Sequence, residues 1–158
     1  MMEPKPVRES QVFTTELVLP NDTNQLGNLL GGRLMHWIDI TAAIASQRHS
    51  GRVCVTASVD ELNFHDPIKL GEIVTLQASV NRAFRTSMEV GVVVIAQGLR
   101  SGSPRRANTA YLTFVAVDEQ GKAIPVPAVI AETEDEKRRY EEAMVRRQHR
   151  LLQRKNSS

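Results

Sequence analysis

Residues 28–49, NLLGGRLMHWIDITAAIASQRH, constrain the fold of this chain more than any other segment. Apolar residues lie almost all round the helix that this segment would form, and a helix of that kind belongs inside a fold. We therefore predict a long, central, buried helix. Two features interrupt the apolar pattern, namely the pair Gly31-Gly32 near the start and the carboxylate of Asp39 in the middle.

Each of these two features has a structural and a functional explanation. Glycines near a helix start can fray the first turn or allow close contact with a strand, or they can leave backbone N–H groups accessible to a ligand at the positive end of the helix dipole. A carboxylate is rarely buried unless it is paired, and Asp39 shares its helix face with small and apolar side chains. From these residues alone, a structural Asp39 held by a backbone amide or by His36 is the simpler explanation.

Composition narrows the classes of protein that remain. A chain of 158 residues fits one domain of ordinary size. Cys54 is the only cysteine, which excludes a disulfide framework and a cysteine metal site. The first ten residues are polar with two prolines, and no apolar run approaches the roughly 18 residues that a membrane span needs. We expect a soluble, cytoplasmic protein with no membrane partner.

Strand-like segments surround the predicted helix. One precedes it at residues 12–19, and four follow it at residues 53–64, 73–80, 88–96 and 108–117. Each is rich in β-branched or aromatic residues and is bounded by turn-forming residues. Their connections are too short for crossover helices, so most neighbours should pair antiparallel. The pattern predicts an α+β fold in which one curved antiparallel sheet closes on the central helix.

A charged segment ends the chain at residues 132–155. It is acidic at its start and basic afterwards, an order that suits the dipole of a helix. Nucleic-acid binding would normally require stacking aromatics, and Tyr140 is the only aromatic residue here, so we favour a solvated surface helix and no nucleic-acid partner. The expected organisation is a flexible N-terminus (1–10), one folded domain (11–130) and a charged C-terminal helix and tail (131–158).

The order of strand, buried helix and four strands, together with the motif PNDTNQLGNLLGGRLMHWIDITAAIAS, resembles the hotdog-fold acyl-CoA thioester hydrolases. Within that superfamily it is similar to the brain-type cytosolic acyl-CoA hydrolases and their small bacterial relatives of broad specificity. The resemblance spans roughly residues 14–127 and rests on Pro20, Asp22, Asn24, Gly27, Gly31, Gly32, Leu34, Met35, Asp39, Asn63, Phe64, Gly71, Glu72, Thr86 and Ser87. It implies a five-stranded antiparallel sheet wrapped around a long central helix.

The resemblance also implies a function, the hydrolysis of acyl-CoA to free CoA and a carboxylic acid. Asp39 would be the catalytic carboxylate, acting as general base or as nucleophile. Asn28 matches a position where some relatives carry a catalytic asparagine, although an asparagine beside glycine also suits a helix N-cap. The backbone amides near Gly31 and Gly32 would polarise the thioester carbonyl. No metal or bound cofactor is implied, because CoA is part of the substrate and product.

The phosphates of CoA require cationic or hydroxyl partners. The primary candidates are Arg85, Thr86 and Ser87 at the start of a strand, and the wider candidates are Arg100, Arg105 and Arg106. Each arginine has the alternative of being a solvated surface residue. The acyl chain should run beside the central helix.

The resemblance implies a homodimer, often assembled further into a tetramer or hexamer. If Asn28 and Asp39 both lie on one helix, their separation of eleven residues corresponds to roughly 16 Å. We therefore expect antiparallel central helices that bring Asn28 of one subunit to Asp39 of the other. The alternative is that Asn28 lies in a loop, or has no catalytic role.

Two other functions remain open. A hotdog hydratase would use a histidine or an Asp/His pair, and Asp60 and His65 lie five residues apart. An odd separation in a strand points two side chains to opposite faces, so we interpret both as sheet residues, and His36 and His49 as surface or structural residues. A non-catalytic acyl-CoA sensor would need only the pocket.

Overall fold

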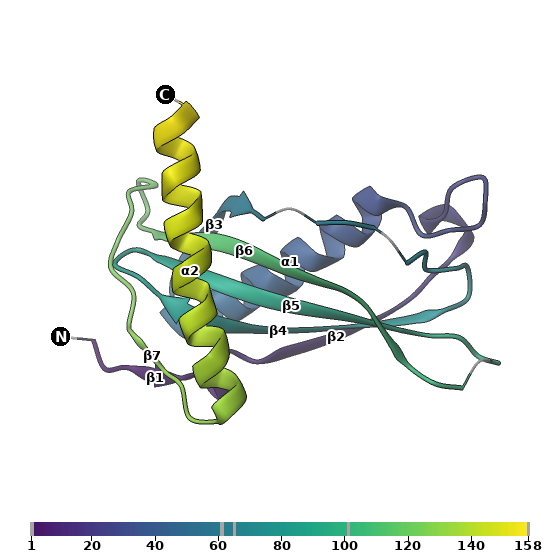
Figure 1. Cartoon of the computed structure of the whole chain (residues 1–158), viewed down its shortest axis with the longest axis horizontal. Coiled ribbons are helices and arrows are strands. Elements are labelled where there is room, and N and C mark those ends of the chain that lie inside the picture. The colour runs from purple at the N-terminus through teal and green to yellow at the C-terminus, as the bar shows by residue number, and fades with distance from the viewer. Residues whose placement is uncertain (1, 61, 65, 101, 158) are drawn as a thin grey trace.

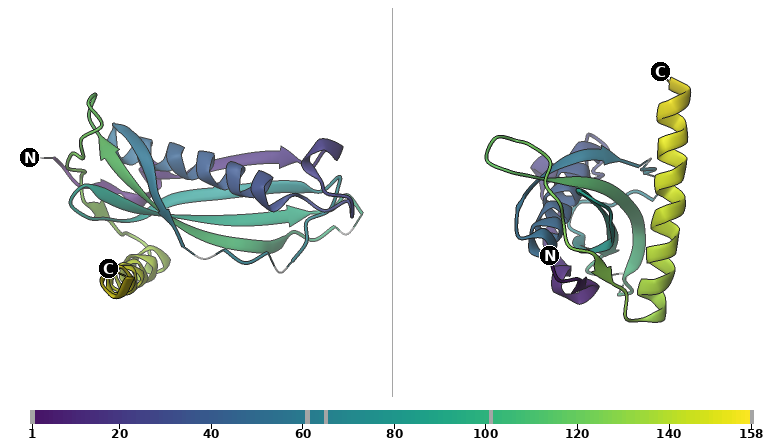
Figure 2. Two further views of the ribbon diagram at one scale, coloured as in Figure 1. Left: turned by 90° about the horizontal axis from the view of Figure 1, so that it is seen from above. Right: turned by 90° about the vertical axis from the view of Figure 1, so that its left-hand side faces the viewer.

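The computed structural model describes residues 2–60, 62–64, 66–100 and 102–157. Its centre is a five-stranded antiparallel sheet in the order β2-β4-β5-β6-β3. The sheet curls around helix α1 (Gly31–Ser50), while helix α2 (Glu134–Ser157) crosses the outer face of the sheet (Figure 1, Figure 2). The strands are β2 (Val12–Leu17), β3 (Val53–Val59), β4 (Ile73–Ala83), β5 (Ser87–Gln97) and β6 (Arg105–Val117). The predicted α+β architecture is confirmed.

The core lies between the concave face of the sheet and α1. Alternate residues of the three central strands point inward and are buried, as the period of two in a strand requires. Helix α1 contributes Leu34, Ile38, Ala42 and Ala45 to the same core. The inward strand residues are Val74, Leu76, Ala78, Val80, Met88, Val90, Val92, Val94, Ala96, Ala110, Leu112, Phe114 and Ala116.

Helix α1 differs from its prediction in two ways. It begins at Gly31 rather than at residue 28, because Leu30 is the N-cap residue and has an extended backbone. It is also not buried all round: His36 and Gln47 are exposed, and Ile40 retains 46% of its accessible surface. The sheet wraps only one side of α1. Its C-terminus agrees with the prediction, since Gly51 follows Ser50 in the left-handed conformation, with φ +69°.

The N-terminal segment is packed against the domain, although the sequence predicted a flexible tail for residues 1–10. Strand β1 (Lys5–Pro6) pairs in parallel with β7 (Val129–Ile130), and a 3-10 turn, η1 (Val7–Ser10), follows it. Ser10 is fully buried, and its Oγ accepts a hydrogen bond from the Val80 N–H at 2.9 Å. A second 3-10 turn, η2 (Pro20–Asp22), lies between β2 and α1.

Strand β3 is shorter than the predicted strand at residues 53–64. It ends at Val59, so Asp60 is not a strand residue, and the Asp60 carboxylate instead accepts a hydrogen bond from Arg150 of α2. The chain then turns toward the N-terminal end of α1, where the Phe64 ring lies beside Gly31. His65 lies outside the described residues.

Helix α2 lies on the surface, as its charge predicts, with Glu136 and Ala143 as its buried residues, but one side of it is packed on the sheet. Although much of it is exposed, ion pairs join it to the outer face of the sheet: the Arg146 Nε lies 2.7 Å from Oε1 of Glu89, a β5 residue that is fully buried. The Arg146 guanidinium also stacks on the Tyr111 ring, 3.6 Å from its centroid. In the part of the chain that is described, neither helix is long and apolar enough to cross a membrane.

Candidate active site

Asp39 is held by a residue of the edge strand. It lies midway along α1 and is partly exposed, and its Oδ1 accepts a hydrogen bond from Oγ1 of Thr56, in β3, at 2.7 Å. Neither His36 nor a backbone amide holds it among the described residues. The Asp39 side chain is therefore oriented by one oxygen, while the described residues provide no hydrogen bond to Oδ2. Such a carboxylate can act on a water molecule or on a carbonyl carbon.

Within the described residues, the first backbone N–H groups of α1 have no hydrogen-bond partner. The first N–H groups of a helix have no intrahelical partner, and the N-cap residue Leu30 provides no side-chain hydrogen bond to them. A Cβ on Gly32 would meet nothing within 4 Å, so this glycine faces open space, whereas a Cβ on Gly31 would lie 3.4 Å from the Phe64 ring. Gly32 and Asp39 are seven residues apart, or roughly 10 Å along the helix axis. Within one subunit, the Gly32 N–H and the Asp39 carboxylate are therefore too far apart to contact the same carbonyl group of a bound molecule.

Asn28 lies in the loop before α1, not on the helix. Its Oδ1 accepts a hydrogen bond from Lys69 Nζ at 3.3 Å. The same loop contains Asn24, whose Oδ1 accepts hydrogen bonds from the backbone N–H groups of Leu26 at 2.9 Å and of Asn28 at 3.1 Å. Asn24 is exposed, and no hydrogen bond from its Nδ2 group is recorded in the described residues. The predicted distance of roughly 16 Å between Asn28 and Asp39 assumed that both residues lie on one helix. Because α1 begins at Gly31, that distance does not apply.

An ion-pair cluster fixes the neighbouring loop. Arg105 donates to Glu72 at 2.5 Å and to Asp66 at 2.9 Å, and Glu72 also accepts a hydrogen bond from the Lys69 N–H at 2.7 Å. Chiefly because of the hydrogen bond from Arg105, the pKa of the Glu72 carboxyl is held below its ordinary value. The Arg105 guanidinium is thus engaged in holding the loop, which leaves it little capacity to bind a phosphate.

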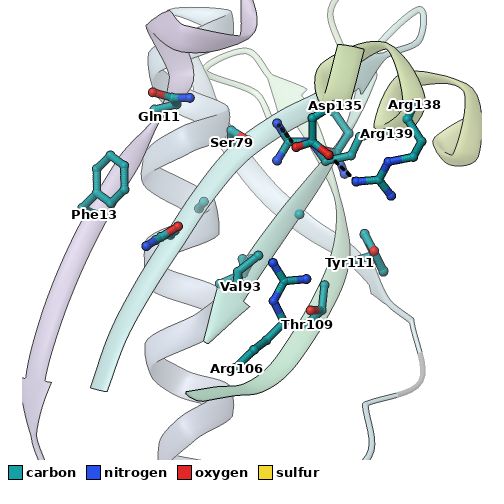
Figure 3. A pocket seen from close by; sticks show the side chains of 15 residues that line it. Gln11, Phe13, Ser79, Val93, Arg106, Thr109, Tyr111, Asp135, Arg138 and Arg139 are labelled. Carbon is teal, nitrogen blue, oxygen red and sulfur yellow. Dashed lines mark hydrogen bonds and ion pairs between the residues drawn. The ribbon is translucent and has the colours of Figure 1, made fainter. Parts of the chain in front are cut away.

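The predicted phosphate contacts lie at two distant places. Ser87 begins β5 opposite Val115 of β6, whereas Arg106 pairs with Ile95 near the other end of β6. Nine residues of strand, or roughly 30 Å, separate Val115 from Arg106. Arg106 lines a hollow of about 180 Å³ on the outer face of the sheet, as do Arg138 and Arg139 of α2. Figure 3 shows these side chains. Arg85 and Thr86 lie in the β4–β5 turn next to Ser87, so one subunit does not bring Arg106 to them.

In the part of the chain that the structure describes, the other titratable side chains form no candidate metal site. Among residues 2–60, 62–64, 66–100 and 102–157, no three His, Cys, Asp or Glu side chains are grouped so that they could hold a metal ion. His49 is fully buried, and its Nε2 lies 2.7 Å from the Pro127 carbonyl oxygen. This hydrogen bond joins the end of α1 to the segment before β7, so His49 is a structural residue.

The curled sheet, the central helix and the carboxylate on that helix define a hotdog-fold protein, and comparison with known proteins agrees. The family model of the thioesterase superfamily matches residues 26–103. An uncharacterized acyl-CoA thioester hydrolase of Bacillus subtilis is 42% identical over 150 residues, which cover 95% of this chain and 87% of the relative. The cytosolic acyl-CoA thioester hydrolase of Rattus norvegicus is 40% identical over 142 residues, covering 89% of this chain but 37% of that longer relative.

Solved structures of acyl-CoA hydrolases are also similar to this chain. The acyl-CoA hydrolase of Staphylococcus aureus, solved with butyryl-CoA, CoA and CoA disulfide, is 39% identical with a TM-score of 0.91, covering 98% of this chain and 94% of that one. A hexameric acyl-CoA thioesterase is 41% identical with a TM-score of 0.92, covering 96% of this chain and 97% of that one. This chain belongs to the thioesterase superfamily, within the group of acyl-CoA thioester hydrolases.

Three alanine variants of the Staphylococcus aureus enzyme are also among the similar solved structures. They replace an asparagine, an aspartate fifteen residues later, and a threonine seventeen residues after the aspartate. In this chain, Thr56 also follows Asp39 by seventeen residues, and the residue fifteen before Asp39 is Asn24. Sequence reasoning missed Thr56, because a threonine in a strand is ordinary and only the folded structure places it beside Asp39.

Proposed function

We propose that this chain hydrolyses acyl-CoA thioesters to free CoA and a carboxylic acid, with Asp39 as the catalytic carboxylate. The observation that carries the proposal is the hydrogen bond from Thr56 to a partly exposed Asp39. A carboxylate with one oxygen fixed and the other available suits a general base or a nucleophile better than a purely structural role. The family membership supports the same reaction.

The chemistry requires few groups. Asp39 either takes a proton from water, which attacks the thioester carbonyl carbon, or attacks that carbon itself, in which case water then hydrolyses the resulting anhydride. The N–H groups at Gly31 and Gly32 stabilise the negative charge on the carbonyl oxygen, helped by the positive end of the α1 dipole. The CoA thiolate leaves readily without strong acid assistance. In this proposal Asp39 and its donors suffice, and no metal or further cofactor is needed.

The loop residue that assists Asp39 is proposed to be Asn24. The spacing from Asn24 to Asp39 equals that of the two residues replaced in the Staphylococcus aureus enzyme. The Asn24 Oδ1 is occupied by backbone N–H groups, which fixes the side chain and leaves Nδ2 to donate to a substrate oxygen or a water. Asn28, the position first predicted, is the alternative.

We propose that each active site is shared between two subunits. Strand β3 is a sheet edge, and apolar side chains remain exposed on it and beside it on α1. They are Ile40, Val53, Val55 and Val59. A two-fold dimer with antiparallel α1 helices would cover them and would bring Gly32 and Asn24 of one subunit to Asp39 of the other. The hexameric relative supports further assembly of such dimers into a hexamer.

The nucleotide end of CoA is proposed to bind near Arg85, Thr86 and Ser87, which lie together at one end of the sheet. Arg106 lies too far along β6 to join them in the same subunit. Action on cytoplasmic acyl-CoA is consistent with the cytosolic name of the rat relative.

A free-thiol assay with acetyl-CoA to palmitoyl-CoA tests the proposal. We expect wild-type protein to release CoA in the presence of EDTA, and Asp39→Asn to lower kcat by about 100-fold or more with an unchanged circular dichroism spectrum. Tight binding of CoA esters without thiol release would favour the sensor function. Water addition to an enoyl-CoA would favour the hydratase function.

A further inference from the structure

A buried carboxylate fixes the loop at residues 66–72, which precedes β4. Glu72 retains 8% of its accessible surface, and its two carboxylate oxygens accept hydrogen bonds from the Arg105 guanidinium at 2.5 and 3.0 Å. Its Oε2 also accepts the Lys69 backbone N–H at 2.7 Å. A carboxylate is rarely buried unless it is paired in this way. Glu72 therefore ties the loop to Arg105 at the start of β6.

Arg105 also holds the beginning of this loop. Its Nε donates to the Asp66 carboxylate at 2.9 Å, and its Nη2 donates to the Pro67 carbonyl oxygen at 3.0 Å. The guanidinium thus serves acceptors on three residues of one loop, which requires the planar fork of an arginine rather than the point charge of a lysine. The Glu72–Arg105 pair therefore fixes both ends of the loop.

The 66–72 loop is paired, in turn, with the loop at residues 24–30. Both loops lie at the end of the sheet that is remote from α2 (Figure 1). Two backbone hydrogen bonds and one antiparallel bridge join them. These are the bonds from the Leu29 N–H to the Ile68 carbonyl at 2.7 Å and from the Leu70 N–H to the Gly27 carbonyl at 2.9 Å, and the bridge between Asn28 and Lys69. The position of the 24–30 loop therefore depends on that of the 66–72 loop.

The 24–30 loop determines where the Asn24 side chain points. The Asn24 N–H donates to the Asn28 carbonyl at 2.8 Å, and the Asn24 Oδ1 accepts the Asn28 N–H at 3.1 Å. Asn28 is also the residue that bridges to the 66–72 loop, and Leu29, which follows it, directly precedes the N-cap residue of α1. A shift of the 66–72 loop would therefore move Asn24 relative to the N–H groups at the start of α1.

We propose that Glu72 and Arg105 are a positioning pair for catalysis, which holds Asn24 in place relative to the N–H groups at the start of α1. The inference rests on the proposed function, in which one subunit supplies both sets of donors to the same thioester. These donors act on charge that develops in the transition state. Their misplacement therefore lowers kcat and leaves KM nearly unchanged.

Steady-state kinetics of Glu72→Gln test the pair. The substitution removes the charge and turns an amide donor toward Arg105, so we expect kcat to fall about tenfold while KM stays within about twofold. Arg105→Lys keeps a positive charge but lacks the fork, so it should lower kcat in the same way, and it tests the inference if Glu72→Gln does not fold. Glu136→Gln is the matched control, because Glu136 is also buried and accepts a backbone N–H, from Glu132 at 2.8 Å, but lies in α2. It should leave kcat unchanged.

A double-mutant cycle shows whether the pair acts through Asn24. Once Asn24→Asp has removed the Nδ2 donor, adding Glu72→Gln should lower kcat by less than about twofold more, because both changes remove the same contribution. Three results would overturn the inference: losses that multiply in the double variant, a raised KM with unchanged kcat, or a loss of kcat no greater than that of Glu136→Gln.

Hydrogen exchange measured by mass spectrometry separates this inference from the proposed function. We expect Glu72→Gln to speed exchange of the backbone amides at residues 24–30 while the amides of β5 stay protected, and Glu136→Gln to leave residues 24–30 unchanged. Wild type that releases thiol, with equal exchange of residues 24–30 in Glu72→Gln and wild type, defeats only the positioning role. Absence of thiol release with faster exchange in Glu72→Gln defeats only the hydrolase, because the pair still holds the loop.

Discussion

The hydroxyl of Thr56 donates to the carboxylate of Asp39 at 2.7 Å, which ties the edge strand of the sheet to the middle of the central helix. Strand β3 therefore has two roles. Its residue Thr56 orients the carboxylate, and its open edge provides the surface on which we propose that a second subunit completes the site.

Removal of the Thr56 hydroxyl tests the first role. We expect Thr56→Val, which keeps the shape of the side chain, to lower kcat by about ten- to a hundredfold, because a misplaced catalytic group loses much of its effect. Thr56→Ser keeps the hydroxyl and should retain most of the activity. Thiol release on the two variants, at matched thermal stability, provides the comparison. Equal activity in Val and Ser variants would show that the contact is not used in catalysis.

The two loop asparagines can be distinguished by substitution. Asn24→Asp keeps the oxygen that accepts the Leu26 and Asn28 N–H groups but removes the Nδ2 donor. We expect it to lower kcat by about 100-fold, whereas Asn28→Ala should lose only the Lys69 contact and little activity. Thiol release by both purified variants is the measurement. The opposite order would return the catalytic role to Asn28.

Most of the fold could be predicted from local sequence patterns, whereas the candidate site could be predicted only in part. The strands were predicted because their segments are rich in β-branched or aromatic residues and are bounded by turn-forming residues, and Gly51 marked the end of α1. Leu29 and Leu30 extended the apolar pattern and led to a helix start three residues too early. The buried Glu89 gave no signal, because an acidic residue in a strand ordinarily faces solvent, whereas here the arginines of α2 lie over it. Strand order and the Thr56 contact arise from pairings between segments distant in the chain.

His49 provides a pH-dependent test of the fold. Burial lowers the pKa of the His49 imidazole below its ordinary value of 6.5. The folded protein therefore favours the neutral ring, and the unfolded chain binds the proton more readily. The contribution of the neutral His49 ring to the free energy of unfolding is fully present above about pH 6.5. As the pH falls from there through the folded pKa, this contribution is lost at a rate of at most about 1.4 kcal/mol per pH unit.

The His49→Gln variant isolates that contribution. Glutamine keeps a donor for the Pro127 carbonyl but does not titrate. Urea unfolding at several pH values between about 7.5 and 5 should show that wild type loses more stability on acidification than the variant does. Parallel pH profiles for the two proteins would show that His49 does not titrate on unfolding in this range.

The central claim, that a catalytic site is built from two subunits, is tested most directly by mixing two inactive proteins. Asn24→Asp and Asp39→Asn chains with different tags are co-expressed, and mixed dimers are isolated through both tags and verified by native mass spectrometry. In a shared-site dimer, one site receives both lesions and the other receives none, so thiol release should recover to roughly half of the wild-type rate per dimer. If each site lies within one subunit, every site keeps one lesion. Activity no higher than that of the two parents would then contradict the account.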